Sequence, residues 1–267
     1  MKGTAWSLGS ASAPPQRLGP KRRYPVHYEG MHQGAVGSMR RVERCGRSLV
    51  EKRMSDPARH RTEVVALRAL ARAGLPVPEV VEATPGSILM TFMPGERLDG
   101  MGADERLERL RGSATLLRRL HGMAPPRGLP SAPDDASIIR RYREAGGPAL
   151  PLTIHPVHRA VFCHGDWTDG NLLAIDGTVT AVIDWEAAHA GDPIREVSRA
   201  AWGAARKDPR SFETIVDAYG ADPERVRAWS AIHAAELWLW FSEAGPPEYL
   251  EQLTGELRSW PPEYMAA

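Results

Sequence analysis

The segment VFCHGDWTDGNLLA, residues 161–174, gathers side chains that can transfer protons or bind a metal ion. His164, Asp166 and Asn171 lie close together in it, between two short apolar runs. A further carboxylate, Asp184, ends another apolar run in the segment VIDWE. Polar groups at this density beside predicted strands cost stability, so we expect them to have a function.

The residues between Asn171 and Asp184 predict a β-hairpin that turns at Asp176–Gly177. A hairpin pairs its strands antiparallel, so Asn171 and Asp184, which flank it, are brought together in space. An amide oxygen and a carboxylate at one point form an oxygen-rich site of the kind that Mg²⁺ prefers. Asp166, on the loop that enters the hairpin, then lies beside the metal. A carboxylate there can accept the proton of a hydroxyl group that attacks a phosphoryl group.

The part of the chain before this segment predicts a small antiparallel sheet with one helix. Apolar runs separated by Gly-bearing turns indicate three strands, and the helix after them ends at Gly74 and Pro76. Two further short apolar runs, split by a Pro-Gly turn, complete a five-stranded sheet. The strands are expected at residues 26–31, 39–44 and 48–54 and within residues 77–95, and the helix at residues 56–74.

The part of the chain after the sheet predicts a larger, mainly helical lobe that contains the polar hairpin. Residues 104–123 have the pattern of an amphipathic helix, and the chain is mostly helical from Pro193 onward. We therefore expect an α+β fold with an N-terminal lobe at residues 24–93 and a C-terminal lobe at residues 94–267. Residues 1–23 have the composition of a disordered leader. A cleft between two lobes is a common site for a small molecule.

The composition narrows the functional classes. The 34 Lys and Arg and 33 Asp and Glu among 267 residues leave a net charge of +1, which does not indicate a nucleic-acid partner. No apolar run approaches the roughly 18 residues that span a membrane. The two cysteines exclude a disulfide framework, so we expect a cytoplasmic protein.

The charge is distributed unevenly along the chain. Residues 1–72 contain 15 Lys and Arg and 5 Asp and Glu, a net charge of +10. Residues 211–267 contain 3 Arg and 10 Asp and Glu, a net charge of −7. The acidic end favours a cationic ligand, and the alternative is that most of these charges lie on solvated faces.

The motifs HGDWTDGN and IDWE together resemble those of the aminoglycoside phosphotransferase family, which has a bilobal protein-kinase-like fold. The family pattern is His-Gly-Asp, four residues, Asn, a short hairpin and then Ile-Asp-Trp/Phe-Glu. Protein kinases have Arg in place of Gly165 and Asp-Phe-Gly in place of Asp184–Glu186, which favours small-molecule substrates over proteins here. The matching residues are His164, Gly165, Asp166, Asn171, Ile183, Asp184, Trp185 and Glu186.

The resemblance implies site residues outside these motifs. Lys52 matches the lysine that contacts the α- and β-phosphates of the nucleotide, and Glu63 matches its ion-pair partner. The backbone of Thr91 and Met93 is expected to contact the adenine edge. The family has Asp-Leu shortly after its Gly-Asp-Pro motif, whereas this chain has Glu196 in place of that Asp.

The segment HQGAVGS, residues 32–38, falls where the family's nucleotide loop lies. Its expected nucleotide-binding residues are Gly34, Gly37 and Ser38. It lacks a full Gly-x-Gly-x-x-Gly pattern, so a plain hairpin turn explains it equally well. We interpret His164 as a histidine that holds the loop, because Asp166 is better placed as the base.

The resemblance implies an O-phosphotransferase that uses ATP or GTP with Mg²⁺ and phosphorylates a small-molecule alcohol. Asp166 is the expected catalytic base, and Asn171 and Asp184 are the expected metal ligands. The acidic C-terminal segment favours a cationic acceptor such as an aminoglycoside or a basic peptide antibiotic, and hence antibiotic resistance. The alternatives are a metabolic kinase for a sugar, choline, ethanolamine or homoserine, and a nucleotide-binding module without catalysis. We expect a monomer or weak dimer without nucleic-acid or membrane partners.

Overall fold

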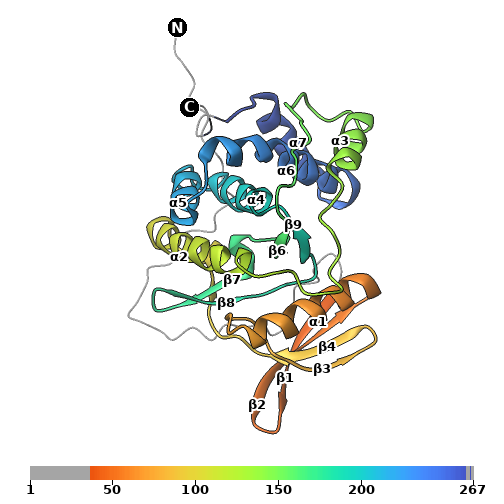
Figure 1. Ribbon diagram of the computed structural model, residues 1–267, viewed down its shortest axis with the longest axis vertical. Coiled ribbons are helices and arrows are strands. Elements are labelled where there is room, and N and C mark those ends of the chain that lie inside the picture. The colour runs from red at the N-terminus through yellow and green to blue at the C-terminus, as the bar shows by residue number, and fades with distance from the viewer. Residues whose placement is uncertain (1–36, 263–264, 266–267) are drawn as a thin grey trace.

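The computed structural model describes residues 37–262 and residue 265 of the chain. Within these residues an antiparallel sheet comes first, and a larger, mainly helical part follows (Figure 1). The leader expected at residues 1–23 and the expected nucleotide-binding residue Gly34 lie outside the described residues. The described chain therefore has the α+β class that the sequence predicts.

The N-terminal sheet has four strands in the order β1-β2-β4-β3, and each neighbouring pair is antiparallel. Five strands were expected, and the expected first strand, residues 26–31, lies outside the described residues. The described sheet is therefore smaller than predicted. Its strands are β1 (Gly37–Arg44), β2 (Arg47–Met54), β3 (Val80–Thr84) and β4 (Ser87–Thr91).

Helix α1 (Pro57–Arg72) packs against strands β2, β3 and β4 of this sheet. It begins at this point because the Asp56 side chain accepts hydrogen bonds from the first free backbone amides and Pro57 fits the first helical position. Val64, Leu67 and other apolar residues on one face are buried in the core. This packing directs Glu63, which is also buried, toward strand β2.

The part of the chain that follows the sheet contains helices and short strands. Strands β5, β7 and β8 form one small sheet, and β6 pairs with β9 in another. The elements are β5 (Glu96–Arg97), η1 (Leu98–Gly100), α2 (Ala103–His121), α3 (Asp135–Glu144), β6 (Val161–Cys163), η2 (Asp169–Asn171), β7 (Leu172–Ile175), β8 (Thr178–Val182), β9 (His189–Gly191), α4 (Pro193–Ala205), α5 (Arg210–Tyr219), α6 (Pro223–Ala244) and α7 (Pro247–Arg258).

Strands β7 and β8 form the hairpin predicted from the sequence. The connecting residues Asp176 and Gly177 both have positive φ, 43° and 89°, as a tight two-residue hairpin turn requires. The hairpin lies between the N-terminal sheet and the helices α4 to α7 (Figure 1). The Val182 amide donates to the Pro76 carbonyl, which ties the hairpin to the segment after α1.

Buried aromatic rings connect the two polar segments on either side of the hairpin. Trp185 is fully buried, and its ring centroid lies 5.8 Å from that of Phe162 on β6 and 4.4 Å from that of His164. The loop after β6 and the loop after β8 therefore share one core. In the part of the chain that the structure describes, no helix is long and apolar enough to cross a membrane.

Candidate active site

The two flanks of the hairpin meet as the sequence predicts. Leu172 pairs with Val182, and the Ile183 amide donates to the Asn171 carbonyl at 3.0 Å. Asp184 follows directly and has φ of +65°, a left-handed conformation that only a few residue types adopt at low cost. Strained backbone of this kind is concentrated at functional sites. The Asp184 carboxylate is 42% exposed and is available to a ligand.

His164 holds the loop between β6 and η2. Its Nδ1 accepts a hydrogen bond from the Asp166 amide, so its proton is on Nε2, which donates to the Ile183 carbonyl at 3.0 Å. The residue between them, Gly165, has φ of +85°, and a Cβ there would lie 2.1 Å from the Ala187 carbonyl oxygen. These contacts fix the backbone at Asp166, and they support the interpretation of His164 as a positioning residue.

The two carboxylate oxygens of Asp166 have different partners. Oδ2 accepts from the Asn171 amide at 2.9 Å, and Oδ1 accepts from the Arg199 guanidinium of α4 at 2.7 Å. Burial acts to raise the pKa of Asp166, but the charge and hydrogen bonds of Arg199, with smaller effects of His164 and Asn171, hold it below its usual value. Asp166 is therefore ionised at neutral pH and can accept a proton.

Lys52 on β2 lies at the centre of three carboxylates. Its Nζ is 2.7 Å from Glu63, 2.8 Å from Asp184 and 3.0 Å from Glu186, which also pairs with Arg59. Burial acts to lower the pKa of Lys52, but these carboxylates outweigh it and raise the pKa above its usual value. Lys52 already pairs with all three carboxylates. We therefore interpret this cluster as a place where the lysine can bind an anionic group, and not as a metal site formed by the three carboxylates alone.

Most of the expected site residues line one pocket of about 260 Å³ between the sheet and the hairpin, which we call the sheet-side pocket. Ser38 does not line it, whereas Met39 and Arg40 of β1 do. The expected site residues that line it are Lys52, Glu63, Thr91, Met93, Asn171 and Asp184.

The sheet-side pocket also has an apolar part. Val50, Met90 and Leu173 line it together with Ile183. The Thr91 amide already donates to the Glu79 carbonyl at 3.0 Å, which excludes that amide as a donor to a ligand. A flat apolar ring can occupy this end of the pocket while anionic groups reach Lys52 at the other.

A second pocket of about 300 Å³ is lined mainly by residues 168–170, α4 and α6, and we call it the helix-side pocket. Asp166 is not among the lining residues of either pocket. The helix-side pocket shares Arg97 and Gly170 with the sheet-side pocket, so the two adjoin. Arg199, the partner of Asp166, lines only the helix-side pocket of the two. A larger hollow of about 350 Å³ on the N-terminal sheet contains none of the expected site residues.

The donor atoms near the hairpin fit a magnesium ion. The Asn171 amide nitrogen is held by Asp166, so its side-chain oxygen is the atom left for a ligand. The Asp184 carboxylate is partly exposed and lines the same pocket. Oxygen ligands of this kind, few in number and beside a space for phosphates, are those that Mg²⁺ uses.

Comparison with known protein families decides the classification. The model of the family described as "Phosphotransferase enzyme family" (APH) matches residues 34–229, which is most of the chain. The chain belongs to this phosphotransferase family. A search of curated protein sequences finds no match.

Similar solved structures show a kinase-like fold over most of the chain. The macrolide 2'-phosphotransferase MphH from Brachybacterium faecium is 19% identical with a TM-score of 0.60, and the match covers 86% of this chain and 90% of MphH. A choline/ethanolamine kinase family protein from Mesorhizobium loti is 20% identical with a TM-score of 0.61, over 85% and 88%. The gentamicin complex of APH(2")-IIa is 14% identical with a TM-score of 0.64, over 89% and 92%.

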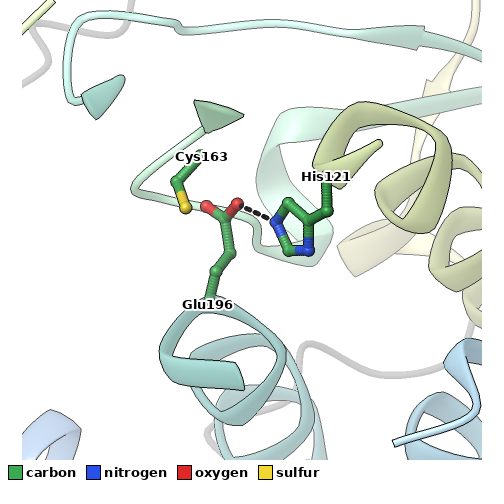
Figure 2. Close-up of side chains that lie close together, drawn as sticks. All are labelled: His121, Cys163 and Glu196. Atoms are coloured by element: carbon green, nitrogen blue, oxygen red, sulfur yellow. Dashed lines mark hydrogen bonds and ion pairs between the residues drawn. The ribbon is translucent and has the colours of Figure 1, made fainter. Parts of the chain in front are cut away.

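In this phosphotransferase-family chain, Glu196 supports the loop that carries Asp166. Its buried carboxylate accepts from the His164 amide at 3.0 Å, from the Gly165 amide, and from His121 Nε2 at 2.8 Å (Figure 2). Burial acts to raise the pKa of Glu196, but the hydrogen bond and charge of His121 outweigh it and lower it to about 2. Glu196 thus makes loop contacts from the position where the family has Asp.

The neighbouring Cys163 does not turn this group into a metal site. Figure 2 shows its sulfur beside the Glu196 carboxylate, but burial raises the pKa of the thiol well above its usual value. The other ring nitrogen of His121 lies 2.8 Å from the Tyr219 hydroxyl. Since both the histidine and the carboxylate already have partners, we interpret the group as a structural hydrogen-bond network.

Arg199 is the site residue of this phosphotransferase-family chain that sequence reasoning missed. It lies 33 residues after Asp166, in a helix whose buried face includes Glu196 one turn earlier. A helical spacing of three residues places Glu196 and Arg199 on the same side of α4. This spacing could have indicated Arg199 as a site residue only if Glu196 was already known to contact the loop that carries Asp166.

Proposed function

We propose that the protein is a small-molecule kinase that transfers the γ-phosphoryl group of ATP or GTP to a hydroxyl group. The observation that carries this proposal is that the hydrogen-bond partners of Asp166 line two adjoining pockets. Its Oδ2 is held by Asn171 of the sheet-side pocket, and its Oδ1 by Arg199 of the helix-side pocket. A base in this place reaches a phosphoryl donor on one side and an alcohol on the other.

The sheet-side pocket suits a nucleoside triphosphate with its base at the apolar end. Lys52 presents a buried cation on β2, fixed by Glu63, to the α- and β-phosphates. Asn171 and Asp184 would hold Mg²⁺, which when bound offsets phosphate charge. Lys52 now contacts Asp184, and phosphates entering the pocket offer it an alternative partner.

The proposed reaction forms one P–O bond and breaks another. The acceptor oxygen bonds to the γ-phosphorus, the bond from that phosphorus to the β,γ-bridging oxygen breaks, and the nucleoside diphosphate leaves. The hydroxyl proton passes to the Asp166 carboxylate. Phosphoryl transfer requires a protein mainly to position the reacting groups and to stabilise charge, and a rigid loop helps to position them. The contacts of Asp166 with His164, Asn171 and Arg199 make it rigid.

The acceptor belongs to one of two classes under this proposal. A cationic antibiotic, and hence a role in resistance, was expected from the acidic C-terminal segment. Metabolic alcohols, such as a sugar, choline, ethanolamine or homoserine, are the alternative. The solved relatives support small alcohols of both classes, since they include a macrolide phosphotransferase and a choline/ethanolamine kinase family protein.

The test is phosphoryl transfer to a panel of acceptors. The protein is incubated with Mg²⁺ and either ATP or GTP in the presence of antibiotics and metabolic alcohols. We expect nucleoside diphosphate release that requires an acceptor, and one acceptor whose mass increases by a phosphoryl group. Nucleotide binding without transfer to water or to any acceptor would favour a module without catalysis and would contradict the proposal.

A further inference from the structure

The lining of the helix-side pocket contains more basic than acidic side chains. Its charged lining residues are Arg97, Arg199, Arg206, Lys207, Asp99 and Asp169. Of the two acids, Asp169 is almost fully buried, and Arg106 neutralises it at 2.6 Å. Asp99 already pairs with Arg97 at 2.7 Å. The lining therefore has four basic side chains against two carboxylates, although each basic side chain also has a carboxylate partner: Asp99, Asp166, Glu256 and Asp169 for Arg97, Arg199, Arg206 and Lys207.

The acidic C-terminal segment does not change this charge. Three of its carboxylates are paired with arginines from other helices, which the net charge of the segment does not reveal. The pairs are Glu236 with Arg195, Glu243 with Arg141, and Glu256 with Arg206. These pairs reduce the negative charge on which the sequence-based argument for a cationic acceptor rested.

Arg199 is the basic residue best placed to bind a group of the acceptor. Its Nε and Nη2 both point to Oδ1 of Asp166, whereas its Nη1 is 4.0 Å from Glu236. Glu236 is itself held by Arg195 at 2.7 Å and by His233 at 2.9 Å. The Arg199 side chain is 29% exposed and lines the pocket, and its guanidinium has more N–H donors than its contacts with Asp166 use.

We propose that the helix-side pocket binds an alcohol that carries a negatively charged group, and that Arg199 determines this specificity by pairing with that group. The inference rests on the proposed function, because it assumes that this pocket holds the phosphoryl acceptor. Carboxylate, phosphate and sulfate groups share the required chemistry, since an arginine binds each of them through paired hydrogen bonds.

The pairing of Arg199 links recognition of the acceptor to the base. An anionic group that engages Arg199 competes with Oδ1 of Asp166 for the same guanidinium. The Asp166 carboxylate is then left free on that oxygen for the acceptor hydroxyl. A neutral or cationic alcohol leaves the ion pair between Arg199 and Asp166 intact, so it meets a base whose oxygen is already occupied.

The test uses alcohols that share a skeleton and differ in charge. Gluconate, glucose and glucosamine form one set, glycerate, glycerol and serinol form another, and kanamycin serves as a polycation. Binding is measured by calorimetry with a non-hydrolysable ATP analogue and Mg²⁺ present at saturation, so that the sheet-side pocket is filled. Phosphoryl transfer to each compound is then measured with ATP.

We expect the anionic member of at least one set to bind at least about tenfold more tightly than its neutral and cationic counterparts. Arg199→Gln should abolish this preference, and Arg199→Lys should restore part of it. Lys207→Gln should weaken anion binding without changing the contacts of Asp166, because the Lys207 side chain is 53% exposed and pairs with Asp169. Arg141→Gln, which breaks the exposed pair with Glu243, is the matched control and should change nothing.

The inference is overturned if no anionic member binds better than its neutral counterpart, or if the preference persists in Arg199→Gln. Transfer of phosphate to a neutral or cationic compound, kanamycin included, in preference to the anionic ones would also overturn it while leaving the proposed function in place. Failure of the protein to bind the nucleotide analogue would instead refute the proposed function.

Discussion

At the scale of single residues, the site depends on side chains whose positions are fixed by backbone contacts. His164 is bonded at both ring nitrogens, Asn171 donates to Asp166, and Asp184 is held in a left-handed conformation by the end of the hairpin. Each polar group therefore has one orientation before a ligand arrives. Preorganised groups of this kind lower the cost of positioning in the reaction.

Substitution of Asp184 should weaken nucleotide binding that depends on Mg²⁺ and leave nucleotide binding without Mg²⁺ nearly unchanged. Asp184→Asn removes the carboxylate charge, so Mg²⁺-dependent nucleotide binding should weaken about tenfold or more, while binding without Mg²⁺ changes little. Calorimetry with and without Mg²⁺ measures both. Asp176→Asn, at the opposite end of the same hairpin and also at positive φ, is the control. Equal Mg²⁺ dependence in wild type and Asp184→Asn would show that Asp184 is not a ligand.

Gly165 is required by the geometry of the loop. Gly165→Ala places a Cβ 2.1 Å from the Ala187 carbonyl oxygen at φ of +85°, so the free energy of unfolding should fall by at least about 2 kcal/mol. Gly112→Ala in the exposed middle of α2 has open space and should instead raise it by about 0.5 to 1 kcal/mol. Denaturant unfolding compares the two. A loss no greater for Gly165→Ala than for Gly112→Ala would contradict the loop geometry.

At the scale of elements, helix α4 connects the support of the loop with the lining of the helix-side pocket. Glu196 contacts the His164 and Gly165 amides from below, and Arg199, one turn later, contacts Asp166. The capping carboxylate of Asp192 starts the helix by accepting from the Ile194 amide at 2.8 Å. A shift of α4 would therefore move both the loop and the partner of the base.

The lowered pKa of Glu196 predicts a dependence of stability on pH. A carboxyl group whose pKa falls from its usual 4.5 to about 2 on folding stabilises the protein above pH 4.5, and this contribution is lost as the pH falls toward 2. The pH-dependent part of the difference between wild type and Glu196→Gln should be on the order of 3 kcal/mol.

Unfolding by denaturant between about pH 7 and about pH 3 measures this difference. It should be largest at neutral pH and shrink below about pH 4.5, and the exposed substitution Glu251→Gln should show no such trend. A difference that stayed constant over this pH range would mean that Glu196 has the same pKa in the folded and unfolded states.

Local signals predicted the elements that hold most of the site. The apolar runs on either side of Asp176–Gly177 predicted the hairpin of β7 and β8, because turn chemistry and strand-length apolar runs are local signals. Gly74 and Pro76 likewise marked the end of helix α1. The meeting of Asn171 and Asp184 followed from the hairpin alone, so it could be predicted without knowing the rest of the fold.

At the scale of the whole molecule, the features that sequence reasoning missed are contacts between distant segments. Strand β5 has only two residues and is defined by its pairing with β7, and β6 pairs with β9 across the intervening hairpin. Three ion pairs of the acidic C-terminal segment join α6 and α7 to α3, to α4 and to Arg206 at the end of α4. Such contacts depend on tertiary packing, and a local charge count cannot reveal them.

The central claim is that Asp166 acts as the base between a nucleotide and an alcohol. The most direct test measures kcat for phosphoryl transfer to the best acceptor of the panel, together with the Kd of the nucleotide, for wild type, Asp166→Asn and the control Asp176→Asn. We predict that Asp166→Asn lowers kcat by about 100- to 10,000-fold with the nucleotide Kd and the fold unchanged. A folded Asp166→Asn variant that kept turnover near that of wild type would contradict the claim.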